Sequence, residues 1–552
     1  MTSRLTALYL LLVPMLIPPL AQTQPPNILL LMAEDMSQRL GAYGDNVART
    51  PNLDNLAQSS VRFTNVFTTA GVCAPSRAAL LTGQHQISFA AQHMRTSTGP
   101  LGPYLALPPA ALRAFPELLR QQGYYTFTDR KLDYQFSGVS AGSGPFTIWD
   151  RDNATDTGWR LRKNPEQPFF GLINFLETHE SGVMRSGGPP HSKIHQAMRN
   201  MRQQANLIAA TVTPPADVKV PPYYPDIPAV RADLARHYDN IHQMDKRVGQ
   251  ILMALAADGL MDNTVVIWTT DHGDGLPRAK RELLHSGVHV PLLLSIPTGY
   301  TSKSRSVDSR LVSFVDLAPT ILELAQAPLP DYLHGTSLLH SQRAYVYASR
   351  DRIDEVTDRQ RMVFDGRYKY IRSWHPDVAG GHPLAFRDNL DMVRAMRTLH
   401  EQGELNEAAS RWFLPPGKEQ LYDLHNDPYE LNNLAESSNP SDARHRARLA
   451  KQLDQFLQQT GDSGAIPESL MRRSLLEAGE IPMTDPPTIT QHQGQLIMSH
   501  PDGVSIGYRN AGDDTWQLYT DPIDRPLSGV RVEARAVRYG WQASDIVEWV
   551  QP

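Results

Sequence analysis

Short runs of apolar residues alternate with amphipathic stretches from about residue 27 to residue 333. Residues 27–33 (Asn-Ile-Leu-Leu-Leu-Met-Ala) form an uninterrupted apolar run, the pattern of a central strand buried on both faces. Residues 169–176 form a further apolar strand pattern, and residues 264–270 form a strand pattern rich in β-branched residues. Residues 228–258 instead carry apolar side chains three or four positions apart, which is typical of a long amphipathic helix. This alternation predicts an α/β fold with a mostly parallel sheet flanked by helices.

The texture of the sequence changes after about residue 341, where the strand-sized pieces become shorter. Residues 361–371 contain an Asp365-Gly366 pair between two β-prone halves, which predicts a hairpin. A helical pattern follows at residues 443–459. Together these features predict a smaller α+β unit over residues 336–475, after a first and larger domain over residues 25–335.

The last part of the chain, residues 488–552, alternates polar and apolar residues in short pieces between Gly, Asp and Pro turns. This pattern predicts a small β-sandwich as an accessory domain. Residues 483–487 have the composition of a linker between it and the preceding unit.

The first 21 residues have the layout of a secretory signal peptide. Arg4 precedes an apolar run at residues 7–17, and Pro18-Pro19-Leu20-Ala21 follows as a cleavage region. The run is too short and too broken by proline to span a membrane comfortably. We therefore expect an exported protein, periplasmic or secreted, with no membrane insertion after the signal is removed.

Composition excludes some classes of partner. Of the 552 residues, 41% are hydrophobic and 20% charged, as in an ordinary globular protein. The formal net charge of -5 gives no basis for binding nucleic acid or an anionic membrane. An anionic substrate would therefore have to be bound by a local cluster of basic residues.

The chain has a single cysteine, Cys73, which excludes an internal disulfide and a four-cysteine zinc site. Pro75 suits the first turn of a helix and Gly83 its end, so Cys73 is expected at a helix N-terminus, where anions are favoured. Arg77 lies one turn further on and can hold an oxyanion. The alternative is a buried structural cysteine beside an unrelated arginine.

Chemically active side chains follow several of the predicted strands. They are Glu34 and Asp35 after the first strand, then Lys131, then His179, then Asp271 and His272. Because the carboxyl ends of parallel strands meet at one edge of a sheet, these groups predict a pocket there. It would offer carboxylates to a hard cation and basic groups to an oxyanion. For Glu34 and Asp35 alone, a solvated turn is the competing interpretation, and for His179 it is a core imidazole with satisfied hydrogen bonds.

The segment Cys73-Ala74-Pro75-Ser76-Arg77, followed by Leu81-Thr82-Gly83, resembles the signature of the type I sulfatases. The resemblance extends from about residue 27 to residue 434. It implies an alkaline-phosphatase-like fold, a sulfatase catalytic domain over residues 25–335 and a sulfatase C-terminal subdomain over 336–475. It also implies that a formylglycine-generating enzyme converts Cys73 to formylglycine.

The resemblance further implies one calcium ion per active site, held by Glu34, Asp35, Asp271 and His272. Glu34 stands where the family usually has an aspartate. Histidine is an unusual ligand for calcium, which prefers oxygen, so contact with the sulfate is the alternative role for His272.

The catalytic residues implied by the resemblance are Cys73, Arg77, Lys131, His179 and Lys280. The basic residues would bind the sulfate, and His179 would protonate the leaving group. Asp133 replaces the histidine that usually follows the first lysine, and His289 stands where arginine is commoner. Neither position is given a role.

Within the family, the stretch Pro221-Pro222-Tyr223-Tyr224-Pro225 and the residue 27–83 block are most similar to the N-sulfoglucosamine sulfohydrolase branch. The expected substrate is a sulfated, glycosaminoglycan-like carbohydrate, with N-sulfoglucosamine favoured. Residues 488–552 resemble the C-terminal β domain of chitobiases and β-hexosaminidases, which is either structural or carbohydrate-binding. Two rival functions are a phosphoester hydrolase of the same fold and an inactive protein that binds sulfated glycans.

Overall fold

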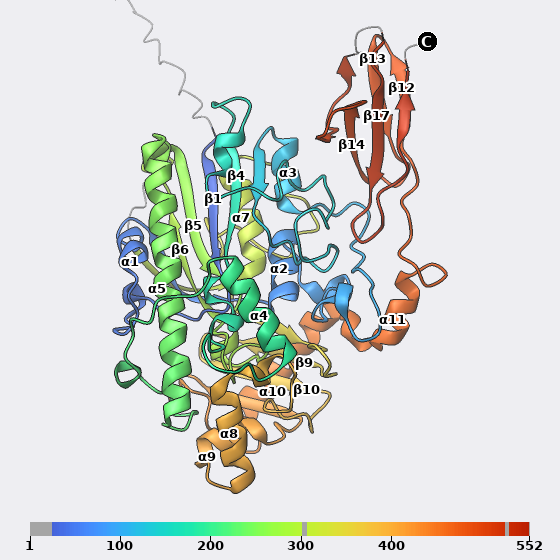
Figure 1. The fold of residues 1–552 in the computed structure, drawn as a ribbon. Coiled ribbons are helices and arrows are strands. Elements are labelled where there is room, and N and C mark those ends of the chain that lie inside the picture. Colours follow the sequence, from blue (N-terminus) through green and yellow to red (C-terminus); the bar gives the residue numbers. More distant parts are fainter. Residues whose placement is uncertain (1–24, 301–305, 525–528, 551–552) are drawn as a thin grey trace, which may run out of the picture.

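The computed structural model describes residues 25–300, 306–524 and 529–550, and a seven-stranded sheet forms its centre (Figure 1). The strands lie in the order β3-β4-β1-β5-β6-β2-β7. Their bounds are β1 Asn27–Ala33, β2 Val61–Phe67, β3 Tyr125–Thr128, β4 Phe169–Phe175, β5 Thr264–Thr270, β6 His289–Ser295 and β7 Ser306–Ser313. Every residue of β1, β4 and β5 is buried, as their mostly apolar and β-branched residues predict for central strands.

Neighbouring strands are parallel except at β6, which runs antiparallel to both β5 and β2. The expected mostly parallel sheet is thus confirmed, with one reversed strand. The chain passes from β5 to β6 through residues 271–288, which include only the short helix α6 (His285–Val288). A parallel return would need a crossover to the opposite end of the sheet. Residues 271–288 therefore stay at the edge where β1, β4 and β5 end.

Helices cover both faces of the sheet, and the side chains of β1 alternate between them. Ile28, Leu30 and Met32 pack in an apolar cluster with α2 (Cys73–Thr82), α3 (Phe115–Gln121) and α7 (Leu317–Leu324). Leu29 and Leu31 face the other cluster, which includes α1 (Pro51–Ala57) and α5 (Pro228–Ala257). The period of two along β1 therefore divides the core into two layers.

The long amphipathic helix predicted at residues 228–258 is confirmed as α5. The helix α4 (Lys193–Gln204) lies between β4 and α5, and of its residues only His195 and Arg202 are buried. Ser192 caps α4 by accepting a hydrogen bond from the backbone N–H of His195 at 3.1 Å.

The predicted α+β unit is built on a four-stranded antiparallel sheet in the order β11-β10-β9-β8. The expected hairpin joins β9 and β10, and Gly366 adopts a positive φ of 96° in its turn. The bounds are β8 Val346–Arg350, β9 Gln360–Phe364, β10 Tyr368–Ser373, β11 Glu419–Asp423, α8 Asp391–Gln402, α9 Glu407–Ser410, α10 Pro440–Thr460 and α11 Glu468–Leu475. Leu449 and Leu453 of α10 pack on this sheet.

The end of the chain forms two small antiparallel sheets, β12-β13-β16 and β15-β14-β17-β18 (Figure 1). The bounds are β12 Thr488–His492, β13 Gln495–Ser499, β14 Ser505–Asn510, β15 Gln517–Leu518, β16 Ile523–Asp524, β17 Val532–Val537 and β18 Val547–Trp549. Leu496 and Met498 from one sheet share an apolar cluster with Ile506 and Ala534 from the other. The two sheets therefore pack face to face, as a sandwich does.

The predicted domain boundaries stay predictions, and the predicted signal peptide, residues 1–21, lies outside the described residues. Among the helices of the described ranges, none combines the length and the apolar character that a membrane crossing requires.

Candidate active site

Most of the predicted site residues lie just beyond the carboxyl ends of the central strands. Ala33 at the end of β1 lies beside Phe175 of β4 and Thr270 of β5 in the sheet register. The chain segments that leave these three strands carry most of the predicted site residues, namely Glu34, Asp35, His179, Asp271 and His272. The structure therefore brings them together at one sheet edge, as expected from the sequence.

Cys73 is the first residue of α2, and its side chain is fully buried. Its Sγ atom lies 3.3 Å from His272 Nε2, 3.6 Å from Lys280 Nζ and 3.8 Å from an Asp35 carboxylate oxygen. The helix begins at Cys73 because Val72 before it is extended, and it ends where Gly83 adopts a φ of 66°. The only cysteine thus faces three ionisable groups at a helix N-terminus.

Asp35 accepts hydrogen bonds from three different segments. Its Oδ2 accepts from Lys280 Nζ and from the backbone N–H of Glu180, both at 2.6 Å, and its Oδ1 lies 3.0 Å from His272 Nε2. Burial alone would raise the pKa of Asp35, but Lys280, His179 and His272 hold it well below its usual range. Asp35 is therefore a carboxylate.

Arg77 directs its guanidinium group at the acidic residues of the site. Nε donates to Asp271 Oδ2 at 3.0 Å and Nη1 to Asn174 Oδ1 at 2.6 Å, while Nη2 lies 3.5 Å from Glu34 Oε1. The Arg77 side chain is only 2% exposed. In this arrangement Arg77 fixes the positions of two acidic side chains that leave neighbouring strands.

Glu34 and Lys131 form the other side of the cluster. Lys131 Nζ lies 2.8 Å from Glu34 Oε1 and 3.8 Å from Asp133. Glu34 Oε2 is buried and has no hydrogen-bond partner among the described residues. An orphaned buried carboxylate oxygen beside other acidic groups is a position that a cation would stabilise.

Two overlapping groups of side chains could hold a metal ion. One consists of Asp35, Cys73, Asp271 and His272, and the other of Glu34, Asp35 and His179; within each group the ligand atoms lie within 4.8 Å of one another. His272 Nδ1 lies 2.9 Å from the carbonyl oxygen of Gly273, so this nitrogen carries a proton and Nε2 points into the site. The donor set of carboxylates with one imidazole fits a divalent cation.

His272 is electrostatically coupled to the acidic residues. Burial lowers its pKa, but Asp271, Asp35 and Cys73 outweigh that effect and raise it to about 10. The same negative field that stabilises a proton on His272 would stabilise a metal cation.

His179 lies across the site, and its Nδ1 accepts a hydrogen bond from the backbone N–H of Ser181 at 3.3 Å. Because Nδ1 is the acceptor, the ring proton sits on Nε2. Burial and the nearby Lys280 hold the pKa of His179 well below its ordinary range. The free site therefore contains a neutral imidazole that can donate a hydrogen bond.

Sequence reasoning missed a buried ion pair beside these residues. Arg281 Nη1 and Nη2 each donate to one oxygen of Glu180, both at 2.9 Å, and both side chains are at most 5% exposed. Glu180 directly follows His179, and Arg281 directly follows Lys280. The pair therefore joins the two loops that carry these residues, and adjacency to them was the signal that could have pointed to it.

Asp133, which stands where a histidine is expected from the resemblance, forms an ion pair with Arg95. Arg95 Nη2 lies 3.2 Å from Asp133 Oδ2, and both residues have positive φ values, 47° each. With 29% of its side chain exposed, Arg95 is more accessible than Lys131 at 6%. Sequence reasoning gave Asp133 no role and did not find Arg95.

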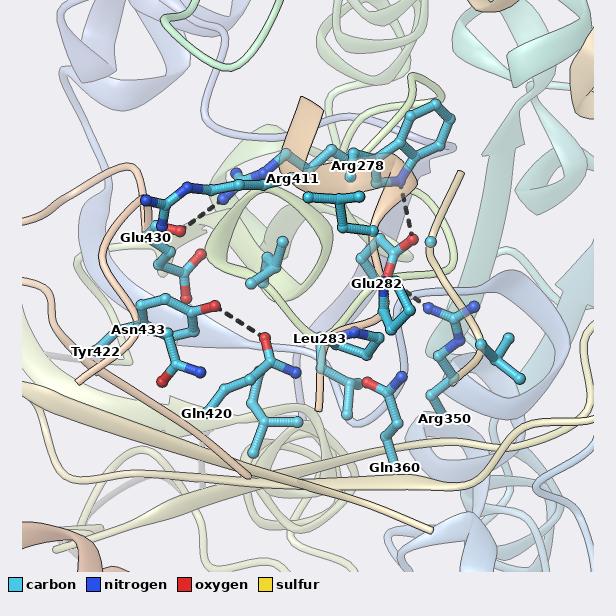
Figure 2. Close-up of a pocket in the computed structure, with 18 residues that line it drawn as sticks. Arg278, Glu282, Leu283, Arg350, Gln360, Arg411, Gln420, Tyr422, Glu430 and Asn433 are labelled. Carbon is cyan, nitrogen blue, oxygen red and sulfur yellow. Dashed lines mark hydrogen bonds and ion pairs between the residues drawn. The ribbon is translucent and has the colours of Figure 1, made fainter. Parts of the chain in front are cut away.

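A cavity of about 230 Å³ is lined by Arg278, Glu282 and Leu283 of the loop that carries Lys280 and by residues of the α+β unit (Figure 2). The nine predicted site residues are all described, and none of them lines this cavity. In its wall, Glu282 lies 2.5 Å from Arg350 and accepts a hydrogen bond from Trp412 Nε1 at 3.3 Å. The cavity is therefore separate from the candidate active site, and its wall ties the Lys280 loop to the α+β unit.

The Glu180–Arg281 pair yields a stability prediction. We expect Arg281→Met to lower the free energy of unfolding by about 3–5 kcal/mol, because the buried Glu180 would lose both hydrogen bonds from Arg281 and keep only Lys280, 4.0 Å away, as a cationic neighbour. The double variant Glu180→Leu/Arg281→Met should recover much of this loss. Urea denaturation measures both changes.

The matched control is Arg531→Met, which breaks the exposed Arg531–Glu548 pair and should cost at most about 1 kcal/mol. Equal losses in the single and the double variant would contradict the assignment of Glu180 as a charge that depends on Arg281.

Known proteins are similar to this chain over most of its length. A family model described as "Sulfatase" matches residues 26–327. An ulvan-active sulfatase of Formosa agariphila is 36% identical over 95% of this chain and 91% of its own length. The N-sulphoglucosamine sulphohydrolase of Homo sapiens is 30% identical over 80% of this chain and 92% of its own length.

Solved structures share the fold. A protein in complex with its substrate D-glucosamine-2-N,6-O-disulfate aligns with a TM-score of 0.54 at 17% identity, over 80% of this chain and 100% of its own. The phosphonate monoester hydrolase of Agrobacterium radiobacter aligns with a TM-score of 0.55 at 18% identity, over 86% of this chain and 100% of its own. These structures establish the fold, while the family model and the two relatives establish the family. The chain belongs to the sulfatase family.

Proposed function

We propose that this protein removes sulfate from a sulfated carbohydrate, with formylglycine at position 73 as the nucleophile. The observation that carries the proposal is the position of Cys73, whose Sγ lies within 3.8 Å of His272, Lys280 and Asp35. In this structure, Sγ stands in for the oxygens of the hydrated aldehyde. When present, the hydrated aldehyde supplies an oxygen nucleophile and a second hydroxyl that lets sulfate depart without attack by water on sulfur.

We further propose a calcium ion held by Glu34, Asp35, Asp271 and His272. The support is the dense carboxylate cluster together with the partnerless Oε2 of Glu34. When bound, the ion supplies positive charge that lowers the proton affinity of the nucleophile. His272 is the least typical of the four ligands, because it offers an imidazole nitrogen and calcium prefers oxygen.

The basic residues would stabilise the sulfuryl group during transfer. Lys280 Nζ lies 3.6 Å from Cys73 Sγ, and Lys131 Nζ lies 2.8 Å from Glu34 Oε1 at the same edge of the sheet. Both ammonium groups are held at fixed positions by carboxylates, so they need no reorganisation as charge develops on the sulfate oxygens. Arg77 holds Asp271 and Glu34 in place, and Asp35 is positioned to take the proton of the nucleophile.

His179 would protonate the leaving oxygen. The proton on Nε2 is available because Nδ1 accepts from Ser181. An anionic sulfate group beside Lys280 would offset the positive charge that lowers the pKa of His179, and so would favour the imidazolium needed for acid catalysis.

For the substrate, we propose a sulfated polysaccharide or one of its sugars, with N-sulfoglucosamine favoured. The names of the two relatives support this class, because one is an ulvan-active sulfatase and the other an N-sulphoglucosamine sulphohydrolase. We also propose export through the N-terminal signal, and maturation by a formylglycine-generating enzyme before or during export.

Mass spectrometry of the tryptic peptide that contains position 73 tests the nucleophile. We expect formylglycine when the protein is produced in a host that has the generating enzyme, and loss of sulfate release in Cys73→Ala. An unmodified thiol in an active enzyme would refute the proposal. Release of sulfate from N-, 2-O-, 3-O- and 6-O-sulfated sugars and from ulvan then identifies the substrate, whereas turnover of phosphoesters alone would favour the rival phosphoester hydrolase.

Calcium binding can be measured without activity. We expect saturating Ca²⁺ to raise the melting temperature of the chelator-treated protein. At a Ca²⁺ concentration of a hundred times Kd, binding should add about 2.7 kcal/mol to the free energy of unfolding. Asp271→Asn should weaken this effect strongly, whereas the exposed control Asp513→Asn should not. A melting temperature that is unaffected by chelator and by Ca²⁺ would overturn the metal assignment.

The role of His179 predicts a dependence on the leaving group. We expect His179→Ala to slow the hydrolysis of a sugar sulfate by about 10²–10⁴-fold, because an alkoxide leaves poorly without a proton. An aryl sulfate with an acidic phenol needs less assistance and should lose much less activity. Steady-state kcat/KM on the two substrates measures the difference, and equal losses would remove His179 from this role.

A further inference from the structure

The β-sandwich at the end of the chain packs on the loop that carries Lys131. Figure 1 shows its strands beside α3 and the connections near it. Val537 and Tyr539 belong to the same apolar cluster as Leu132 and Phe136, which also includes one face of the central sheet. The terminal domain is thus continuous with the main core.

The closest aromatic contact of this interface is a ring stack at a tight turn. The backbone N–H of Leu132 donates to Val139 O at 2.8 Å and that of Asp133 to Gly138 O at 3.2 Å, so residues 133–138 turn back on themselves. Phe136 lies within this turn, and its ring stacks on Tyr539 with centroids 5.1 Å apart and an interplanar angle of 12°.

A second aromatic contact fixes the far end of the same loop. Phe146 packs against Trp516 with ring centroids 5.3 Å apart. A Cβ atom at Gly507 in β14 would overlap the ring of Phe146, so glycine is required for this close approach. The loop from residue 131 to residue 147 is therefore held by the terminal domain at two points.

A buried carboxylate joins the two domains by hydrogen bonds. Glu117 of α3 is fully buried and accepts from Tyr539 Oη at 2.5 Å and from Ser505 Oγ. Thr147 at the end of the loop donates to the same carboxylate at 2.6 Å. Two of these donors come from the terminal domain, so its departure would leave Glu117 with only Thr147 and Arg113 Nε, which lies 3.3 Å away.

The loop needs such support because its own conformation is strained. Asp133 and Gln135 have φ values of 47° and 67°, which side chains other than glycine rarely adopt. Conformations of this kind persist only where the surroundings determine them. Asp133, which contacts Arg95, lies in this strained turn, and Lys131, which contacts Glu34, lies two residues before it.

We infer that the terminal β domain positions the sulfate-binding loop, and that Tyr539 acts as a positioning residue for Lys131 through its stack on Phe136. The inference rests on the proposed function, because Lys131 is there assigned to bind sulfate. It also decides between the two roles expected for the domain. The ring of Trp516 is occupied by Phe146 and by the guanidinium groups of Arg509 and Arg535, which makes it part of a packed interface and favours the structural role over sugar binding.

The test is a double-mutant cycle between Tyr539 and Lys131. We expect Tyr539→Leu to lower kcat/KM for a sulfated sugar by about 10²-fold, because a displacement of about 1 Å at a binding group has that effect. In the Lys131→Ala background, the same change should cost about twofold or less. Tyr539→Phe keeps the ring stack and should retain most activity.

The matched control is Tyr519→Leu, which alters the domain's own apolar cluster and leaves the Phe136 contact in place. Equal losses from Tyr539→Leu in both backgrounds, or an equal loss in the control, would overturn the inference. Should Tyr539→Leu fail to fold, the partly exposed Trp516→Ala takes its place in the same cycle.

Hydrogen–deuterium exchange gives a readout that does not depend on activity. We expect the amides of residues 131–139 to exchange faster in Tyr539→Leu than in the unsubstituted protein, with the amides of β1 and β5 unchanged. Unchanged exchange in the loop would refute the positioning role even if the enzyme is a sulfatase. Absence of sulfate release from the unsubstituted, formylglycine-containing protein would refute the proposed function, and exchange would still decide whether the domain holds the loop.

Discussion

The arrangement of the site depends on keeping buried charges in balance at one edge of the sheet. Four carboxylates, those of Glu34, Asp35, Glu180 and Asp271, lie there with at most 1% of each side chain exposed. Each has a basic partner within 3.0 Å, respectively Lys131, Lys280, Arg281 and Arg77. Burying a charge without a partner costs several kcal/mol. This cost is on the order of the whole free energy of unfolding of a domain. These pairings therefore dictate where the loops lie.

The balance of buried charges also affects the binding of charged ligands. A divalent cation alone would add positive charge to a cluster whose four carboxylates are already paired and in which the pKa of His272 is raised to about 10, and a sulfate alone would add negative charge. Together they offset each other, so occupation by both disturbs the balance least. The pairs also hold Lys131 and Lys280 extended into the site, which is the preorganisation that stabilisation of a developing negative charge requires.

Each of the two lysine-bearing loops is supported by a different part of the C-terminal half. The Lys280 loop is tied to the α+β unit through Glu282, Arg350 and Trp412, and Arg278 donates to the carbonyl oxygens of Tyr429 and Glu430. The Lys131 loop rests on the terminal β domain through Phe136 and Tyr539. The strand ends therefore place the acidic residues of the site, with Arg77 of α2 holding two of them, and the C-terminal units support the loops that carry the two lysines.

This division explains what could be predicted from the sequence. Glu34, Asp35, Asp271 and His272 follow buried strands directly, so the rule that parallel strands end at a common edge was enough to bring them together. The partners Arg95 and Arg281 could not be found in this way, because both lie in loops with positive φ, 47° and 78°, whose course depends on contacts from distant segments. The antiparallel direction of β6 could not be predicted either, because an apolar run indicates that a strand is buried but not which way it runs in the sheet.

The single cysteine was open to two interpretations, packing or chemistry, and the structure shows that its surroundings serve both. On one side, Cys73 belongs to a small apolar cluster with Val72, Ala74, Met94 and Ile353. On the other, Sγ faces His272, Lys280 and Asp35. A cysteine needed only for packing gains nothing from three ionisable neighbours, each of which must be desolvated to lie there. The charged side is therefore the one that requires a functional explanation, and the apolar side accounts for how the start of α2 is held still beneath it.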